Sequence, residues 1–367
     1  MNMKLILFEL KKMIRTKGVP ILLLLTVLFI CGLFMRNVIQ QDVLQTKKIE
    51  KFSKYRSNVI SQYQTDREEI LKGPNAEIEA RLEIGGTLYD KLEKLITAIE
   101  DKKWKKELKA EIEVYQSALH YKELEGSFVL NDNDMQKTIK QNEELLKRSL
   151  PKEDLDYSIQ TTVFMKKVIS LLFNTAGIII VLLVLATLIT KEFEDHNMQL
   201  VYSLPIARNK LIGVKFFSLL IVGLVWLSTV FLVSYALPTL FGINVGKIFT
   251  YPLFTNEENF INSRVYIKQT IIYSISFIGF SIATILFLSF FIRNSIVNSL
   301  VILMLFCGGL LVTNSGFNSI WNPFSYQNID FVVLNTPDYY PLGAVVLIGF
   351  MILLLLLTIL SNRKRGI

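Results

Sequence analysis

The sequence predicts an all-α membrane protein with six transmembrane helices, an N-terminal amphipathic interfacial helix and a large helical insert between the first and second crossings. Three observations support this fold class. The 367 residues are 51% hydrophobic with a mean hydropathy of +0.40, which is too apolar for an ordinary soluble enzyme. Six long apolar runs contain no charged residue. The region 36–165 between the first two runs is instead highly charged and has helical periodicity.

The first 17 residues are expected to form a cytoplasmic amphipathic helix lying in the lipid headgroup region. At 100° per residue the apolar and basic residues separate onto two sides. One side has Met3, Ile6, Leu7, Leu10, Met13 and Ile14, and the other has Lys4, Lys11, Lys12 and Arg15. A signal peptide is the alternative, but the apolar run 18–35 exceeds the usual signal-peptide core and no small-x-small cleavage site follows it. We therefore expect a retained first transmembrane helix at 18–35.

Residues 36–165 are expected to form an extracellular helical domain. Gly73-Pro74 ends the first helix, and the turn-rich segment 131–134 precedes the last one. Because the aromatic residues sit at core periodicity, they are interpreted as packing core rather than as a ligand site. Apolar residues recur at helical spacing within the segments 49–70, 88–99, 104–119 and 135–150.

The remaining residues 166–367 are expected to hold five further crossings. The first of these has 23 uncharged residues, enough to cross a hydrocarbon core of about 30 Å. An even number of crossings places both termini on one side. The expected spans are 168–190, 216–238, 269–292, 294–314 and 342–360.

Charge orients these crossings and excludes a nucleic-acid partner. Residues 42–156 carry 21 Lys and Arg against 24 Asp and Glu, so the excess of basic residues flanks the apolar runs. With both termini in the cytoplasm, 13 basic residues lie on the cytoplasmic side against six on the other, as the positive-inside rule requires. The domain 36–165 then lies outside a bacterial plasma membrane, consistent with its lack of cysteine. The six are Arg36, Lys166, Lys167, Lys247, Arg264 and Lys268.

The extracellular segment 313–341 between the last two crossings is rich in aromatic residues and contains only two charged residues, Asp330 and Asp338. Such a segment belongs at the headgroup level or dips into the outer leaflet. Two interpretations stay open, a plain interfacial anchor and an outer gate. The candidate gate residues are Trp321, Phe324, Phe331 and Tyr339.

Catalytic and ion-coupling motifs are absent. The six expected crossings contain no ionisable side chain, which argues against proton or sodium coupling and against a charged selectivity ring. The segment Gly242–Lys247 is one residue short of a nucleotide-binding loop, and no H-E-x-x-H, C-x-x-C or G-x-S-x-G motif occurs. We therefore predict no catalytic, cofactor or metal site in this chain, and energy for any transport must come from a partner.

The polar segment 191–215 between the second and third expected crossings has the sequence K-E-F-E-D-H-N-M-Q-L-V-Y-S-L-P-I-A-R-N-K-L-I-G-V-K. It resembles the cytoplasmic coupling loop of the type-2 permeases of ABC exporters. The acidic pair Glu192 and Glu194, the segment Leu200–Arg208 and the terminal Lys215 match that pattern, whereas His196-Asn197 replaces the usual Gly-Thr pair. Ser203 can cap the helix entering the third crossing, and Pro205 suits its first turn.

The resemblance implies a transmembrane permease subunit that pairs with a second copy or a paralogue and with ABC ATPase subunits, which hold the ATP and magnesium. The substrate would be hydrophobic or amphipathic: an antimicrobial or bacteriocin-like peptide, a lipid or a drug. The alternatives are a membrane-anchored receptor or assembly factor whose extracellular domain binds a partner, and an ion channel. The residues expected to contact the ATPase subunit are Glu192, Glu194, Met198, Leu200, Val201, Ser203, Pro205 and Arg208.

Overall fold

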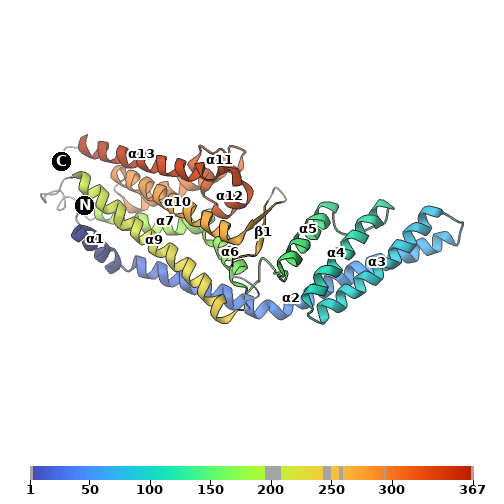
Figure 1. Cartoon of the computed structure of the whole chain (residues 1–367). Helices are drawn as coiled ribbons and strands as arrows, with labels where there is room; N and C mark the ends of the chain where they lie inside the picture. Colours follow the sequence, from blue (N-terminus) through green and yellow to red (C-terminus); the bar gives the residue numbers. More distant parts are fainter. Residues whose placement is uncertain (1–2, 195–207, 243–248, 256–258, 293, 365–367) are drawn as a thin grey trace.

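The computed structural model describes all residues except 1–2, 195–207, 243–248, 256–258, 293 and 365–367. The described residues form two parts joined by one long helix (Figure 1). We call these parts the membrane bundle and the helical insert. Both termini lie at the end of the bundle farthest from the insert (Figure 1). This end is called the loop-side end below, and the opposite end is the insert-side end.

Helix α1 (Met3–Arg15) is followed by the 53-residue helix α2 (Gly18–Ile70), which runs from the bundle into the insert (Figure 1). The helix does not end where the apolar run 18–35 ends but continues without interruption to Ile70. No Gly or Pro occurs between Met35 and Ile70, so nothing in the sequence breaks the backbone hydrogen bonding until Gly73-Pro74. The insert is therefore continuous with the first apolar span.

The insert is completed by α3 (Ala76–Glu100), α4 (Trp104–Glu123) and α5 (Asp132–Arg148). Asn75 caps α3 by accepting a hydrogen bond from the backbone N–H of Glu77 at 3.0 Å. These helices enclose an apolar core of their own, separate from that of the bundle. Its members include Phe52, Val59, Leu88, Leu92, Leu95, Val114 and Tyr115.

The expected second crossing at 168–190 is not one straight helix. It consists of α6 (Thr161–Leu172) and α7 (Thr175–Glu194), which meet at a bend of 62°. Asn174 starts α7 by accepting a hydrogen bond from the backbone N–H of Gly177 at 2.8 Å. A Cβ atom on Gly177 would lie 2.4 Å from the carbonyl oxygen of Leu172, so this close turn requires glycine. The sequence did not reveal this bend, because Asn174 is uncharged and the span was bounded by its charged residues alone.

The rest of the bundle contains four long helices and a short hairpin. Strands β1 and β2 are antiparallel, with Leu253 opposite Ile261. Helix α10 lies inside the bundle, with 72% of its most apolar segment buried. The elements are α9 (Arg208–Phe241), β1 (Pro252–Phe254), β2 (Phe260–Asn262), α10 (Ser263–Phe291), α11 (Ser295–Asn314), η1 (Pro323–Tyr326), α12 (Ile329–Asn335), η2 (Pro337–Tyr339) and α13 (Leu342–Lys364).

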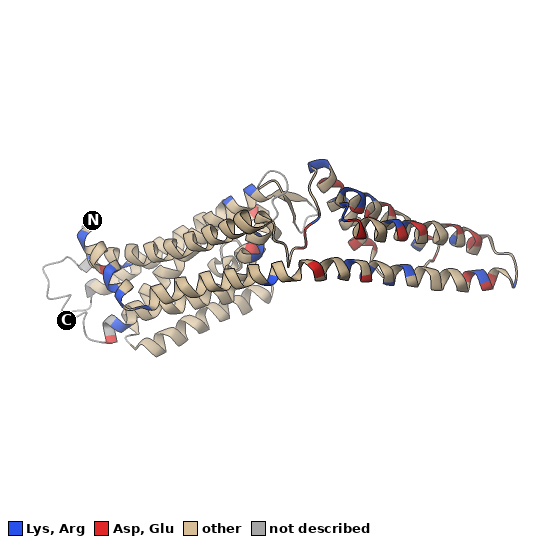
Figure 2. Cartoon of the chain, turned by 90° about the horizontal axis from the view of Figure 1, so that it is seen from below, with Lys and Arg blue, Asp and Glu red and all other residues tan. Residues whose placement is uncertain are grey.

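Among the described residues, five helices are long and apolar enough to cross a membrane, or six when the bent pair α6–α7 counts as one span. Charged residues gather on the insert and at the two ends of the bundle, while the middle of the bundle is almost free of them (Figure 2). This uncharged band is the expected signature of a multi-pass membrane protein.

Candidate functional site

The predicted coupling segment 191–215 begins in the last turn of α7 and ends in α9, and both of these helix ends lie at the loop-side end (Figure 1). Glu194 is the last residue of α7 and is exposed. Glu192 lies in α7 and Arg208 is the first residue of α9, but their side chains are outside the description. The other predicted contact residues, Met198, Leu200, Val201, Ser203 and Pro205, are outside the described residues. Of the predicted contact residues, only Glu194 therefore has a described side chain.

A buried ion pair joins α1 to α9 at Lys215, the last residue of the predicted coupling segment. The Lys215 Nζ atom lies 3.6 Å from Glu9 Oε1, with the two side chains only 2% and 8% exposed. Such a pair is held by mutual attraction at low dielectric, and losing either member leaves a buried charge. The sequence did not single out Glu9, because nothing near it in the chain shows that it pairs with Lys215.

The apolar face predicted for α1 is divided between two environments. Ile6 and Met13 are buried against the bundle, on the side of the helix that also carries Glu9. Met3, Leu7 and Ile14 are between 56% and 74% exposed. An exposed apolar stripe beside a buried one is expected for a helix that packs on protein with one side and on lipid with the other.

At the insert-side end, the predicted gate segment inserts aromatic side chains between α10, α11 and α13. Tyr326 is fully buried and stacks on Tyr273, with ring centroids 5.6 Å apart. Its Oη atom donates to the carbonyl oxygen of Ile320 at 2.7 Å. Phe324 packs edge-to-face on Phe280 and Phe306, at 5.9 and 5.7 Å. We call Phe324, Tyr326 and the rings around them the aromatic plug.

Two glycines make room for this plug. A Cβ atom on Gly343 would lie 2.4 Å from Cε1 of Tyr326, and one on Gly309 would lie 2.6 Å from the ring of Phe324. Real Cβ atoms do not approach so closely, so α11 and α13 accept η1 only because these positions lack a side chain.

The four predicted gate residues fall into two groups. Phe324 belongs to the aromatic plug, and Tyr339 contacts it through Tyr326, with ring centroids 6.3 Å apart. Trp321 and Phe331 are 67% and 45% exposed, and each lies outside the plug. Tyr326 and Tyr273, which hold the plug in place, were missed because aromatic density locates the segment but does not tell which rings are buried.

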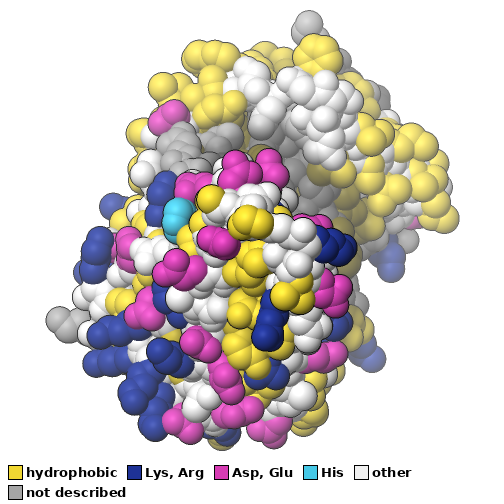
Figure 3. Space-filling view, turned by 90° about the vertical axis from the view of Figure 1, so that its right-hand side faces the viewer, with side chains coloured by type: hydrophobic (Ala, Val, Ile, Leu, Met, Phe, Trp, Pro, Cys, Tyr) yellow, Lys and Arg dark blue, Asp and Glu magenta, His cyan; other side chains and the backbone are white. Residues whose placement is uncertain are grey.

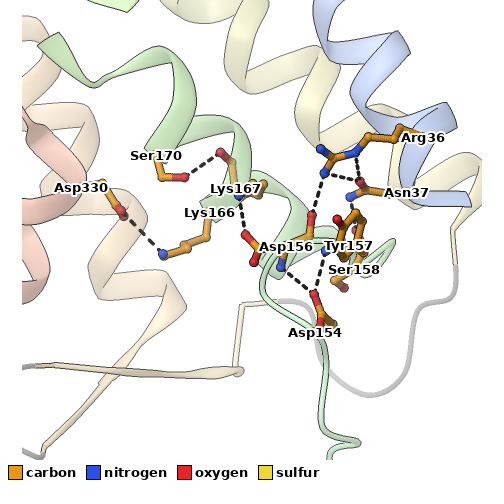
Figure 4. A network of polar contacts seen from close by, with 10 residues as sticks. All are labelled: Arg36, Asn37, Asp154, Asp156, Tyr157, Ser158, Lys166, Lys167, Ser170 and Asp330. Carbon is orange, nitrogen blue, oxygen red and sulfur yellow. Dashed lines mark hydrogen bonds and ion pairs between the residues drawn. The ribbon is translucent and has the colours of Figure 1, made fainter. Parts of the chain in front are cut away.

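A polar network lies beside the plug and links α6 to its neighbours (Figure 4). Lys166 Nζ is 3.5 Å from Asp330 Oδ2 on α12, and Asp330 also accepts a hydrogen bond from the Tyr266 hydroxyl. Lys167 is paired with Asp156 in the segment that leads out of the insert. The two adjacent lysines therefore connect α6 with α12 on one side and with the insert on the other (Figure 4).

The same network reaches the first crossing. Arg36 donates to the carbonyl oxygen of Asp156 at 3.0 Å, and the guanidinium lies 4.8 Å from the centroid of the Tyr157 ring. The buried Asn37 side chain donates to the carbonyl oxygen of Ser158 at 3.0 Å. Asp154 accepts from the backbone N–H groups of Asp156 and Tyr157 (Figure 4). The position where α2 leaves the bundle is therefore fixed to the start of α6.

Two acidic residues of this connecting segment differ in their electrostatics. The hydrogen bond from Lys167 lowers the pKa of Asp156 below its ordinary value, which favours the charged carboxylate. Burial raises the pKa of Glu153, against a smaller lowering by the hydrogen bond from Ser158. In this segment the charged form is therefore favoured for Asp156 and disfavoured for Glu153.

The described residues contain no group of three or more His, Cys, Asp or Glu side chains arranged to hold a metal ion. Residues 3–330 match the family model described as "ABC-2 family transporter protein". No curated protein and no solved structure matches the chain.

Proposed function

Because the chain belongs to the ABC-2 transporter family and is a transmembrane subunit of an ABC transporter, we propose that it exports a hydrophobic or amphipathic substrate outward, driven by a separate ATPase subunit. The observation that supports this most is the family match across residues 3–330, which includes both ends of the bundle. The substrate class we propose is an antimicrobial peptide, a lipid or a drug. ATP and magnesium would be held by the partner subunit.

We infer that energy enters at the loop-side end, where segment 191–215 docks into a cleft of the ATPase subunit. The exposed Glu194 supplies a rim charge, and the apolar residues of the segment fill the cleft. The Glu9–Lys215 ion pair supports this mechanism because it joins α1 to the first turns of α9. A displacement of the loop would then move α1 and α9 together.

The proposed exit lies at the insert-side end, with the aromatic plug as the closed gate. Opening the gate requires η1 to leave its place between α11 and α13, where Gly309 and Gly343 accommodate it. The polar network supports a link between this gate and the rest of the chain, since α12 is joined to α6 through Lys166 and Asp330. A change in the bend between α6 and α7 would therefore act directly on the gate segment.

The proposed assembly is a homodimer or a heterodimer with a paralogue, bound to ATPase subunits in a bacterial plasma membrane. Both termini would be cytoplasmic and the insert extracellular. The location of both termini at one end of the bundle, opposite the insert, is consistent with this orientation (Figure 1). The excess of basic residues flanking the loop-side end supports it through the positive-inside rule.

Reconstitution with the ATPase subunit in proteoliposomes tests the proposal. Replacing Glu194 or Arg208 by alanine should reduce both export and substrate-stimulated ATP hydrolysis, whereas Lys105→Ala on the insert should leave both unchanged. Unchanged export and unchanged coupling in both loop variants would contradict the role proposed for the loop.

A second candidate function is a membrane-anchored receptor or assembly factor whose insert binds a partner. The observation that favours it is the insert's separate core together with its mixed surface, on which basic, acidic and hydrophobic side chains alternate (Figure 3). If no ATPase subunit co-purifies in mild detergent but a protein is retained through the insert, this second function takes precedence.

A further inference from the structure

Two basic residues at the insert-side end have no partner within the described chain. Arg264 and Lys268 lie one turn apart near the start of α10, and both are exposed. Neither forms an ion pair or a hydrogen bond with a described residue. The neighbouring basic residues Lys166, Lys167 and Arg36 differ, since each contacts an acidic residue or a carbonyl oxygen of the chain.

The two cations border a pocket with an apolar floor. The pocket has a volume of about 620 Å³ and lies between α10 and Phe249. Phe249 forms one wall and is held by stacking on Tyr235 of α9, with ring centroids 6.0 Å apart. The lining residues are Phe249, Arg264, Ile267, Lys268, Ile271 and Ile272.

The apolar surface continues from this pocket toward the middle of the bundle. Ile275, one turn beyond Ile271, is 39% exposed. At 1.5 Å per residue, the path from Lys268 to Ile275 covers about 10 Å along the helix axis. A cationic rim followed by an apolar strip perpendicular to the membrane surface matches the shape and polarity of a phospholipid.

We propose that this pocket binds an anionic phospholipid of the insert-side leaflet. Its phosphate would accept hydrogen bonds from Arg264 and Lys268, and an acyl chain would lie along Ile271, Ile272 and Ile275. This proposal does not depend on the proposed export function, because the lipid in this pocket is a bound structural partner and not the transported substrate.

Two other occupants fit the pocket less well. A cationic peptide would be repelled by the positive charges of Arg264 and Lys268. A second copy of the chain, packed on this face by a two-fold axis, would bring the same two cations against each other. An anionic lipid alone satisfies both the charge of the rim and the apolar floor.

The test uses the full-length protein purified in detergent, with bound lipid counted by native mass spectrometry. The two probes are phosphatidylglycerol and phosphatidylcholine with identical acyl chains. The wild-type chain should retain phosphatidylglycerol in preference to phosphatidylcholine. The double variant Arg264→Gln/Lys268→Gln should bind phosphatidylglycerol about 30-fold more weakly, as expected from the loss of two cations near a membrane surface.

A matched control is Lys105→Gln/Lys109→Gln on α4, which removes two exposed lysines with the same spacing from the insert. This control should bind phosphatidylglycerol as the wild type does, and Arg264→Lys/Lys268→Arg should also retain the lipid. If the glutamine variant fails to fold, the salt dependence of lipid binding to the wild-type chain tests the proposal instead. Added salt should release phosphatidylglycerol but not phosphatidylcholine, because salt screens the attraction between the cations and the anionic headgroup. Equal retention of both lipids, unchanged binding in the glutamine variant, or equally tight binding of soluble glycerol phosphate would each overturn the proposal.

Discussion

The two ends of the membrane bundle each contain a partly or fully buried ion pair, but the two pairs are built differently. At the loop-side end, Glu9 and Lys215 form an ion pair between two helices, with side chains 8% and 2% exposed. At the insert-side end, Lys166 and Asp330 are 19% and 15% exposed and belong to a branched network that includes Tyr266. The first pair is deeply buried, whereas the second is partly exposed and its carboxylate contacts both Lys166 and the Tyr266 hydroxyl.

This difference suggests a division of roles. A deeply buried pair is costly to break, so Glu9 and Lys215 join α1 and α9 as one unit. A network near the surface can exchange partners with water at lower cost, which suits an end that must open. The predictions below measure how different the two ends are.

The largest effect is expected from Glu9→Gln, which removes the Glu9 carboxylate from the buried Lys215 ammonium. The free energy of unfolding should fall by about 3 kcal/mol, the lower end of the loss expected when one member of a buried ion pair is removed. The double variant Glu9→Leu/Lys215→Met should recover much of this loss. Thermal unfolding in detergent measures both, with the exposed Lys11→Gln as the control. A loss no greater than that of the control would show that the loop-side pair carries little stability.

The next largest effect is expected at the aromatic plug. Gly343→Ala places a Cβ atom 2.4 Å from Tyr326 and should destabilise the chain by about 2 kcal/mol through overpacking. Gly349→Ala lies on the same helix and has no atom within 4 Å of the added Cβ, so it should be neutral or slightly stabilising. Comparing the melting temperatures of these two variants separates packing from helix propensity. Equal melting temperatures would mean that the plug moves aside without cost.

A smaller difference is expected between the two adjacent lysines of α6. Lys166→Gln leaves Asp330 only 15% exposed and without its cation, and should cost about 1–2 kcal/mol. Lys167→Gln frees Asp156, which is 65% exposed, and should cost less than about 1 kcal/mol. The same thermal measurement checks the order, and a larger loss for Lys167→Gln would contradict the assignment of Lys166 as the main contact.

The smallest effect concerns pH at the insert-side end. The folded-state pKa of Asp156 is lowered, so its stabilisation is fully present above its unfolded pKa of about 3.9 and is lost as the pH falls below it. Asp156→Asn should therefore lower the melting temperature at pH 7. It should have little effect at a pH well below about 3.9, where the carboxyl group is protonated. Glu153, whose pKa is raised, should behave in the opposite way, since Glu153→Gln removes a disfavoured buried charge at pH 7. A pH-independent effect of Asp156→Asn would exclude the charge of this residue as the cause.

Much of the bundle follows from the sequence because charge and turn residues bound its helices. The expected spans 269–292, 294–314 and 342–360 agree with α10, α11 and α13 to within a few residues at most ends. Only at the start of α10 does the helix begin earlier, because Arg264 and Lys268 lie inside it. The helices of the insert likewise end at the predicted breakers, with α2 ending shortly before Gly73-Pro74.

What the sequence does not reveal depends on contacts between distant residues. The bend at Asn174 results from a local cap that hydropathy does not detect. The pairing of Lys166 with Asp330 spans more than half of the bundle sequence, although the unusual lysines and the rare acid were each visible separately. The role of Glu9 also depends on a distant contact. It is a lone acidic residue in a basic helix, and its importance is evident only from its ion pair with Lys215.

The central claim, that the loop-side end receives the ATPase subunit, can be tested by site-directed cross-linking. With Cys31 and Cys307 replaced by serine, single cysteines are placed at Glu194 and, as the control, at the exposed Trp321 of the opposite end. In membranes that contain the ATPase subunit, the cysteine at 194 should cross-link to it, and the cysteine at 321 should not. Cross-linking at 321 but not at 194 would contradict the account.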